Sequence, residues 1–265
     1  MGQLERTRSR CKSLRLTWMA QQLPQLLGEA ESNDWSYLQC VDHLLSYELK
    51  ERDQKRIQRH FRQAHFPMEK RLDDFDYRHQ TTIHKRQITT LLDFNFLDQR
   101  QNLVFIGPPG VGKTHLAIGL GYKAIEAGYK VLFKTAMALV EELELAEKRG
   151  ELKKRISQLA KNDLLIIDEL GYLPMSRQSR YNLFQLVNSL YEYRSIILTT
   201  NKDFTDWGEF FHNDNVAIPI VDRIIHHSHI FMLGGESYRL KEKLTNSRIR
   251  WVNFIGQRWV KIDGH

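Results

Sequence analysis

The feature that most constrains the fold of this chain is a glycine-rich motif near residue 110. The motif matches the pattern G-x-x-x-x-G-K-T, and its residues are Gly107, Pro108, Pro109, Gly110, Val111, Gly112, Lys113 and Thr114. The apolar run at 103–106 predicts a buried strand before the motif, and residues 115–126 predict a helix after it. Because a phosphate-binding loop requires a strand, a glycine loop and a helix in this order, the context favours it over a merely flexible loop.

The residue types of the motif suit a nucleoside triphosphate and its cation. Glycines let the backbone curl so that successive N–H groups point at phosphate oxygens, and the new helix adds its N-terminal partial positive charge. We expect Lys113 to reach the β- and γ-phosphates and the hydroxyl of Thr114 to bind Mg²⁺.

Strand-like and helix-like segments alternate along the rest of the chain. Short apolar runs predict strands at 103–106, 130–133, 164–167, 195–198 and 230–233. Helices are predicted at 82–98, 115–126, 137–161 and 179–193. Continuous apolar strands that alternate with helices indicate a parallel sheet covered on both faces. The sequence therefore predicts an α/β fold with a five-stranded parallel sheet, whose ligand lies at the carboxyl ends of the strands.

Two adjacent acids, Asp168 and Glu169, directly follow the predicted strand 164–167. Two carboxylates at the end of a buried strand are costly without partners, and a Mg²⁺–nucleotide supplies such partners. We expect Asp168 to hold Mg²⁺, directly or through water, and Glu169 to polarise the attacking water as general base. An exposed loop start is the alternative, but the phosphate-binding motif in the same chain favours catalysis. A base poised for water indicates hydrolysis rather than transfer to a metabolite.

Two further polar residues are candidates for the same site. Asn201 follows the predicted strand 195–198 and is a candidate to orient the water, although asparagines at strand ends are usually turn formers. Arg223 is a candidate arginine finger, inserted into a neighbouring subunit's site to offset γ-phosphate charge. A surface salt bridge is the alternative role for Arg223, and the residues leave both open. The histidines at 226–229 lack an accompanying carboxylate or cysteine cluster, which argues against a metal site.

The first 72 residues predict a small all-α domain. Apolar residues between positions 14 and 27 lie close to helical spacing, although Pro24 interrupts them. We expect Asp34 to cap a second helix. Four apolar side chains share one face of that helix: Leu38, Val41, Leu45 and Leu49.

A strongly basic segment extends from residue 50 to residue 71, with eight basic residues against three acidic ones. The chain as a whole carries a formal net charge of +7, which favours an acidic partner such as nucleic acid. A solvated helix face is the alternative interpretation of the basic segment. The candidate DNA contacts, including a second cluster near Gly150, are Lys50, Arg52, Lys55, Arg56, Arg59, Arg62, Lys148, Arg149, Lys153, Lys154 and Arg155.

Composition narrows the class of protein further. Hydrophobic residues make up 42% of the chain, which is enough for a substantial core. The two cysteines, Cys11 and Cys40, form no C-x-x-C pair, so neither a disulfide framework nor a zinc site is expected. No apolar run is long enough to span a membrane, and the basic N-terminus lacks the apolar segment of a secretory signal. We therefore expect a cytoplasmic protein.

Five motifs in combination go beyond the generic phosphate-binding loop. They are G-P-P-G-V-G-K-T-H-L-A, L-L-I-I-D-E-L-G-Y, L-T-T-N, V-D-R-I-I-H-H and E-S-Y-R. Together they resemble AAA+ ATPases of the helicase-loader clade, and within it the IstB-type ATP-binding helper proteins of bacterial insertion sequences. The resemblance runs from about residue 35 to residue 247.

This resemblance implies a role for each matching residue. Residues 107–114 correspond to Walker A, and Asp168 and Glu169 to Walker B. Asn201 corresponds to sensor 1, Arg223 to the arginine finger and Arg239 to a sensor-2-like arginine. The resemblance also implies ATP and Mg²⁺ as cofactors, ATP-dependent self-assembly on duplex DNA, and cooperation with a partner transposase.

The expected organisation is a helical DNA-binding or interaction domain at 1–72 and an AAA+ ATPase domain at 73–248. Residues 249–265 extend past the expected end of such proteins, and we assign them no role. Two other functions share part of the pattern. A loader of the replicative helicase has the same ATPase motifs but is expected to grip a helicase with its N-terminal region. A P-loop kinase needs a substrate-phosphate site and does not need Arg223 of a neighbour.

Overall fold

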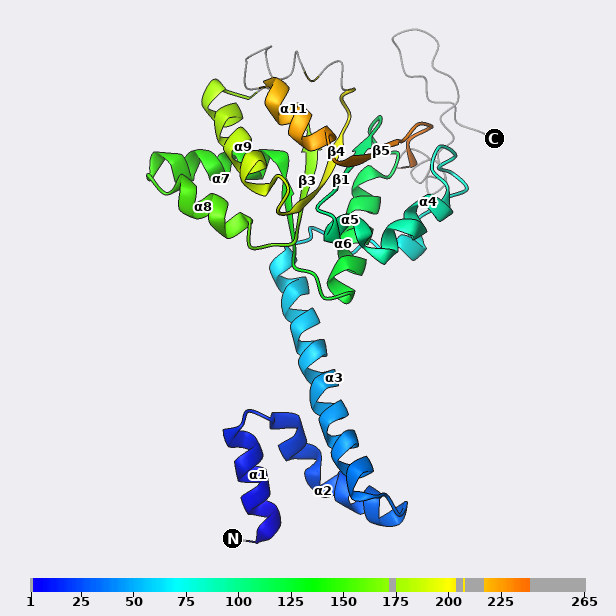
Figure 1. The fold of residues 1–265 in the computed structure, drawn as a ribbon. Coiled ribbons are helices and arrows are strands. Elements are labelled where there is room, and N and C mark those ends of the chain that lie inside the picture. Colours follow the sequence, from blue (N-terminus) through cyan, green and yellow to red (C-terminus); the bar gives the residue numbers. More distant parts are fainter. Residues whose placement is uncertain (1, 172–174, 204–206, 208–216, 239–265) are drawn as a thin grey trace, which may run out of the picture. The chain divides into compact units, whose positions relative to one another are not determined.

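The structure is a computed structural model that describes residues 2–171, 175–203, 207 and 217–238 (Figure 1). The chain divides into two compact units, residues 1–62 and 63–265, and each is described by itself. The domain boundaries after residues 72 and 248 stay predictions. Arg239 and residues 249–265 lie outside the described residues. No helix among the described residues is long and apolar enough to cross a membrane.

The larger unit contains a five-stranded sheet in which all neighbouring strands run parallel, in the order β2-β3-β4-β1-β5. The strands are β1 (Asn102–Ile106), β2 (Val131–Thr135), β3 (Leu164–Leu170), β4 (Ser195–Thr200) and β5 (Ser228–Met232). The helices between them are α6 (Lys113–Glu126), α7 (Ala136–Lys148), α8 (Leu152–Leu159), α9 (Arg177–Leu190) and α11 (Ala217–Ile225). This architecture confirms the predicted five-stranded parallel sheet flanked by helices.

The inner strands β1, β3 and β4 are almost entirely buried because helices cover both faces of the sheet (Figure 1), whereas the edge strand β5 is partly exposed. Alternate side chains such as Val104, Leu165 and Leu198 join the core under α7, α8, α9 and α11. The intervening residues point to the opposite face. There, a Cβ added at Gly121 of α6 would lie only 2.8 Å from Ile166 Cδ1, so the helix lies close against the sheet.

Two predicted helices are interrupted, and both interruptions have a backbone cause. The segment 137–161 forms α7 and α8, because Gly150 takes a left-handed conformation (φ 70°) between them. The segment 82–98 forms α4 (Lys85–Thr90), a 3₁₀ turn η2 (Leu91–Asp93) and α5 (Asn95–Asp98). Phe94, at φ 57°, separates the last two elements, and its ring is buried.

Near its start, the larger unit contains the 3₁₀ turn η1 (Leu72–Asp74). The side chains of Leu72 and Phe75 are 6% and 9% exposed. Phe75 is buried, and it also lines the cavity described below.

The N-terminal unit contains α1 (Gln3–Ser13), α2 (Thr17–Ser32) and most of α3 (Tyr37–Ala64). These helices confirm a helical N-terminal region, and Pro24 lies inside α2 rather than ending it. The core is small: Leu23, Leu26 and Leu44 pack together, with Met19, Trp35 and Cys40 against them.

The start of α3 corrects the prediction for Asp34. The capping residue is Ser36, whose Oγ accepts from Gln39 N at 3.3 Å, while Ser36 N donates to Gln39 Oε1 at 2.8 Å. This reciprocal pair is a capping box. Asp34 precedes it in a left-handed turn, with φ 49°.

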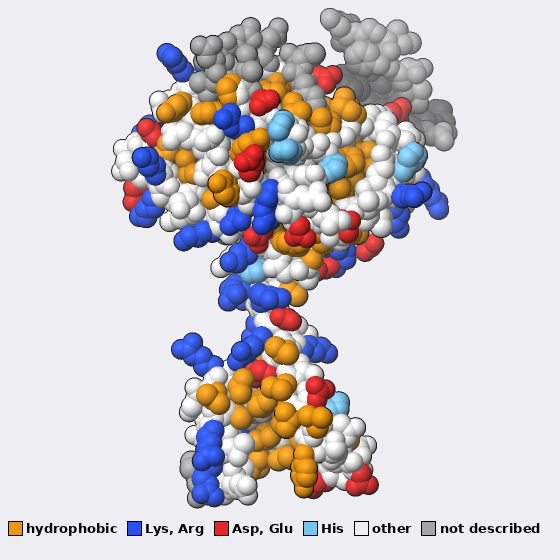
Figure 2. Space-filling view, viewed as in Figure 1, with side chains coloured by type: hydrophobic (Ala, Val, Ile, Leu, Met, Phe, Trp, Pro, Cys, Tyr) orange, Lys and Arg blue, Asp and Glu red, His pale blue; other side chains and the backbone are white. Residues whose placement is uncertain are grey.

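The apolar face predicted on α3 is exposed rather than buried. The exposed fractions of Leu38, Val41, Leu45 and Leu49 are 79%, 50%, 47% and 63%. Figure 2 shows hydrophobic side chains grouped on the surface of this unit. The residues of α3 that are buried in this stretch are instead Leu44 and the acid Glu48.

Glu48 holds the N-terminus of α2 although it belongs to α3. Its Oε2 accepts from Trp18 N at 2.9 Å and Met19 N at 3.0 Å, and its Oε1 accepts from Arg52 Nε at 2.9 Å. Leu16, the residue before α2, has no side-chain cap of its own. Glu48 therefore satisfies backbone donors that would otherwise lack partners. Burial alone would raise the pKa of Glu48, but these hydrogen bonds and the Arg52 charge together lower it.

We expect Glu48→Gln to lower the free energy of unfolding by about 1–3 kcal/mol, because a carboxylate is a stronger acceptor than an amide for three donors. Urea unfolding followed by circular dichroism, with hydrogen exchange at the Trp18 and Met19 amides, measures the effect. Asp42→Asn, at an exposed position on the same helix, is the control.

The same variant has a defined pH dependence. Because the folded pKa of Glu48 lies below its ordinary value of 4.5, its stabilisation is present above pH 4.5 and is lost as pH falls through the folded pKa. The stability difference between wild type and Glu48→Gln should therefore be constant near neutral pH and shrink on acidification. A difference independent of pH would contradict this role of Glu48.

Candidate nucleotide site

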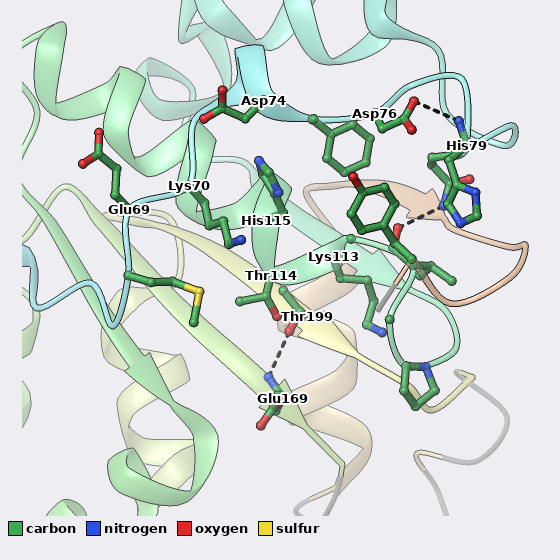
Figure 3. A pocket seen from close by; sticks show the side chains of 18 residues that line it. Glu69, Lys70, Asp74, Asp76, His79, Lys113, Thr114, His115, Glu169 and Thr199 are labelled. Carbon is green, nitrogen blue, oxygen red and sulfur yellow. Dashed lines mark hydrogen bonds between the residues drawn. The ribbon is translucent and has the colours of Figure 1, made fainter. Parts of the chain in front are cut away.

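A cavity of about 370 Å³ lies at the carboxyl ends of the central strands (Figure 3). Its lining comes from the glycine-rich loop after β1, from the ends of β3 and β4, and from residues 68–80. This is the edge of a parallel sheet at which ligands bind. The predicted loop residues Pro109 to Thr114 and the predicted base Glu169 all line this cavity.

Two glycines of the loop are required by both conformation and space. Gly110 and Gly112 have φ of 85° and 97°, in the left-handed region that side chains disfavour. A Cβ at Gly112 would lie 2.5 Å from the ring of Phe75, and one at Gly110 would lie 2.1 Å from Ser237 Oγ. The loop therefore curls as a phosphate-binding loop does, and α6 begins directly after Gly112.

Lys113 is the first residue of α6, and it is only 7% exposed. Its Nζ donates to the carbonyl oxygens of Gly107 and Pro108 at 2.7 and 2.8 Å. These bonds hold a cation against the loop that lines the cavity. Together with the N-terminus of α6, the ammonium group gives this side of the cavity the charge that a phosphate group needs.

Asp168 joins three elements through one oxygen. Thr114 Oγ1 on α6 donates to Asp168 Oδ1 at 2.8 Å, and Thr199 Oγ1 on β4 donates to the same oxygen at 2.6 Å. Asp168 is 4% exposed, and these donors offset the cost of its burial. The two predicted magnesium ligands, Thr114 and Asp168, are therefore in direct contact.

Glu169 has an unusual backbone. Its φ is 64°, in the left-handed region, which costs a residue other than glycine about 1–3 kcal/mol. The pairing of β3 with β4 shifts register between Ile167 and Leu170, so Glu169 lies in an irregularity that re-aims its side chain. Its N–H donates to Thr199 Oγ1 at 2.9 Å (Figure 3). The exposed side chain of Glu169 belongs to the cavity lining.

Residues 68–80 form a wall of the cavity that the sequence motifs did not identify. Gln80 is buried, and its Nε2 donates to Val111 O at 3.1 Å. His115 lies against this wall: its Nε2 hydrogen-bonds Arg71 O at 2.7 Å, and its ring meets Phe75 edge-on at 5.3 Å. Burial lowers the pKa of His115, and the bond to Arg71 O opposes this only in part.

Residues 236–238, which follow β5, contact the glycine-rich loop, and the motifs did not predict this contact. Tyr238 N donates to Gly110 O at 3.0 Å, and His79 Nε2 hydrogen-bonds Glu236 O at 3.0 Å. The rings of His79 and Tyr238 meet at 5.4 Å, and both residues line the cavity. The E-S-Y-R motif contains Tyr238, so the signal was present, but spacing in the sequence does not show this contact.

The other predicted site residues lie elsewhere. Arg223 is on α11, where its guanidinium group lies 5.3 Å from the ring of Phe184 and 5.8 Å from that of Tyr191. Its Nη1 donates to Pro219 O at 3.2 Å. Asn201 follows β4, and its buried Oδ1 has no hydrogen-bond donor among the described residues. Neither Asn201 nor Arg223 is among the cavity-lining residues, and Arg239 lies outside the described residues.

Some of the candidate DNA-binding cations on α3 are committed to neighbours within the chain. Arg52 pairs with Glu48 and also donates to Arg15 O at 2.8 Å. Arg56 pairs with Asp53 at 3.2 Å, and Lys55 lies 5.6 Å from the ring of Trp18. Two further candidates, Lys50 and Arg59, form no ion pair with a described residue.

The second cluster of candidate DNA contacts, near Gly150, also contains both paired and unpaired cations. Arg155 pairs with Glu142, which also pairs with Lys134 at 2.8 Å. Lys154 pairs with Glu151 at 2.9 Å. The remaining candidates, Lys148, Arg149 and Lys153, are exposed, and the described part of the chain holds no ion-pair partner for them.

Solved structures support the fold. A replication initiator DnaA bound to AMPPCP and single-stranded DNA matches with a TM-score of 0.51 and 22% identity, over 66% of this chain and 54% of that one. A DnaI structure matches with a TM-score of 0.50 and 17% identity, over 62% of this chain and 90% of that one. At these identities the similarity concerns the fold, which is that of AAA+ P-loop NTPases.

Sequence relatives are closer. A protein of insertion sequence IS5376 from Geobacillus stearothermophilus, named for ATP binding, is 41% identical over 90% of this chain and 95% of its own length. One of insertion sequence IS21 from Pseudomonas aeruginosa, named likewise, is 40% identical over 92% of this chain and 91% of its own. Residues 9–246 match the family described as IstB-like ATP binding protein. The chain thus belongs to the IstB-like ATP-binding proteins of IS21-type insertion sequences.

Proposed function

We propose that this protein is an ATPase that assembles on duplex DNA and assists the transposase of its insertion sequence. The observation that supports this most strongly is the contact between Thr114 and Asp168 at the cavity. It brings a hydroxyl group of the phosphate-binding loop, which follows β1, to a carboxylate near the carboxyl end of β3, two strands away in the sheet. These hard oxygen donors suit Mg²⁺, which is bound by one or two carboxylates together with substrate phosphates.

Each residue of the site has a distinct task in hydrolysis. Lys113 and the loop N–H groups bind the phosphates, while Thr114 and Asp168 would hold Mg²⁺, which neutralises charge on the phosphate oxygens. Thr114 can donate its proton to Asp168 and still offer an oxygen lone pair to the cation. Glu169 takes a proton from water as the water oxygen bonds to the γ-phosphorus and the bond to the bridging oxygen breaks. The products are ADP and inorganic phosphate.

The surroundings of Arg223 support a role toward a neighbouring subunit. It does not line the cavity of its own chain, and aromatic faces hold its guanidinium group instead. We infer that Arg223 enters the γ-phosphate site of the next subunit, so that ATP is bound at a junction. Head-to-tail junctions of this kind build rings or open helices. Asn201 is assigned to orienting the water, and Arg239 keeps the sensor-2-like role that the family resemblance implies.

The cations without ion-pair partners support binding to the DNA backbone. Contacts from Lys and Arg to phosphates carry no sequence information, so we expect largely sequence-independent binding that weakens steeply with salt. The unpaired cations of α3 and of α7–α8 are the strongest candidates, because a lysine already paired with a glutamate gains less from a phosphate.

The ion-pair pattern gives a matched test of DNA binding. Lys153→Ala should weaken binding to duplex DNA and reduce the steepness of the plot of log K against log salt by about 0.9, one phosphate contact. Lys154→Ala, at the next exposed position, should change both much less, because its charge is already paired with Glu151. Anisotropy titrations of labelled duplex DNA at salt concentrations from about 50 to about 200 mM measure both quantities.

On α3, replacing Lys50 and Arg59, which form no ion pair with a described residue, with alanine should likewise weaken binding and flatten the salt dependence. An unchanged slope of log K against log salt would indicate that this face of α3 does not contact DNA phosphates and is only a solvated helix surface. Single-stranded DNA of the same length is the comparison ligand. Stronger binding to the single strand, or to a replicative helicase than to duplex DNA, would favour a helicase loader instead.

Assembly and catalysis are tested together by mixing two inactive variants. Arg223→Ala should bind ATP nearly normally but hydrolyse it poorly, whereas Lys113→Ala should fail to bind ATP. A mixture should regain activity, because a junction can pair an intact loop from one chain with an intact Arg223 from another. ATPase assays with sedimentation, with and without duplex DNA, measure turnover and size. Arg177→Ala, at an exposed position on α9, is the control arginine.

A mixture as inactive as its components would remove the trans-acting role of Arg223. A protein that stays monomeric with ATP and DNA, and in which Arg223→Ala is fully active, would favour a kinase-like P-loop enzyme.

A further inference from the structure

The hydroxyl group of Thr199 connects the two acids at the end of β3. It donates to Asp168 Oδ1 at 2.6 Å and accepts from Glu169 N at 2.9 Å. Both of its hydrogen-bonding capacities as donor and acceptor are therefore used within the candidate site. Thr199 lines the cavity as part of β4, and its accessible surface is 0%.

A buried threonine is unexpected at this point of an apolar strand. The preceding residues of β4, Ile196 to Leu198, are buried and apolar. A hydroxyl group in such a place is costly unless it is hydrogen-bonded, and here both partners belong to the adjacent strand β3. The hydroxyl group is thus part of the link between β4 and the acids rather than of the general core.

The backbone of Glu169 needs such a link. With φ at 64°, and in an irregularity of the β3–β4 pairing, Glu169 is held away from the extended conformation that the strand would otherwise favour. A conformation of this kind persists only where the surroundings hold it. The bond from Glu169 N to Thr199 Oγ1 is the contact that ties this residue to β4.

We propose that Thr199 is a positioning residue for ATP hydrolysis. Its hydroxyl group holds Glu169 in the left-handed conformation that directs the carboxylate into the nucleotide cavity, and through Asp168 it ties this geometry to Thr114. Thr199 does not itself touch the reacting atoms. The proposal rests on the role of Glu169 as base. It gives Thr199 of β4 a role in hydrolysis that is distinct from the role of Asn201, which follows β4.

The test compares two substitutions at Thr199. Thr199→Val keeps the shape but removes the hydroxyl group, so kcat should fall about 10- to 100-fold, as expected when a catalytic group is misplaced. ATP affinity, measured directly by titration, should stay within about twofold, because the phosphate-binding loop is unaltered. Thr199→Ser keeps the hydroxyl group and should retain most of the wild-type kcat.

Thr200 provides the matched control. It is also 0% exposed, and its hydroxyl group accepts from Lys202 N at 3.0 Å instead of contacting the acids. Thr200→Val therefore removes one buried hydroxyl group from the neighbouring position and should leave kcat near wild type. Thermal unfolding of both valine variants shows whether the two losses of stability are comparable.

Double substitution separates positioning from a general structural effect. If Thr199 acts through Glu169, adding Thr199→Val to Glu169→Gln should lower kcat no further than Glu169→Gln alone. A further loss in the double variant, equal kcat in Thr199→Val and Thr200→Val, or failure of Thr199→Ser to restore activity would each overturn the proposal. Wild-type turnover in Glu169→Gln would instead remove the proposed base, and with it the function on which the inference rests.

Discussion

The candidate site depends on a single carboxylate oxygen, Asp168 Oδ1, which accepts from hydroxyl groups on two other elements. Thr114 reaches it from the first turn of α6, and Thr199 reaches it from β4. The parallel order of β3, β4 and β1 makes this convergence possible, because it brings their carboxyl ends to one edge. The glycine-rich loop and the residues proposed as metal ligand and base are thereby connected to a common point.

Outside this site, the charged residues fall into two groups: those that form ion pairs within the described part of the chain, and exposed cations that form none. Glu48 and Glu142 are acids that each bind two or more donors, and the pKa of each is lowered despite burial. Their partners Arg52 and Arg155 therefore contribute to folding. The exposed cations without acidic partners are the ones left for an anionic ligand. The net charge indicates only that the surface is basic. The ion pairs indicate which of its cations are not already paired with an acid within the described residues.

Local signals in the sequence were sufficient for the sheet and for the residues of the phosphate-binding loop. The motif, the apolar runs and the acid pair at 168–169 each depend on neighbours in the chain. The structure confirms the strands and the helix that begins within the motif, and it places Glu169 in the cavity lining. The contacts of Thr199, Gln80 and Tyr238 depend on packing between distant segments, which periodicity does not encode. The sequence did not predict the cap at Ser36, because Asp34 is an equally good capping residue by type. It also did not predict that the apolar face of α3 is exposed, because the spacing of apolar residues does not show which face of a helix is covered.

The most direct test of the account is the effect of Mg²⁺ on ATP affinity, measured by calorimetric titration of wild type and Asp168→Asn. An asparagine oxygen can still accept from Thr114 and Thr199, so the fold and the metal-free affinity should be retained. Mg²⁺ should strengthen ATP binding to wild type, and most of that increment should disappear in Asp168→Asn, which lacks the negative charge. An equal Mg²⁺ increment in both proteins would contradict the assignment of Asp168 and Thr114 as one magnesium–nucleotide site.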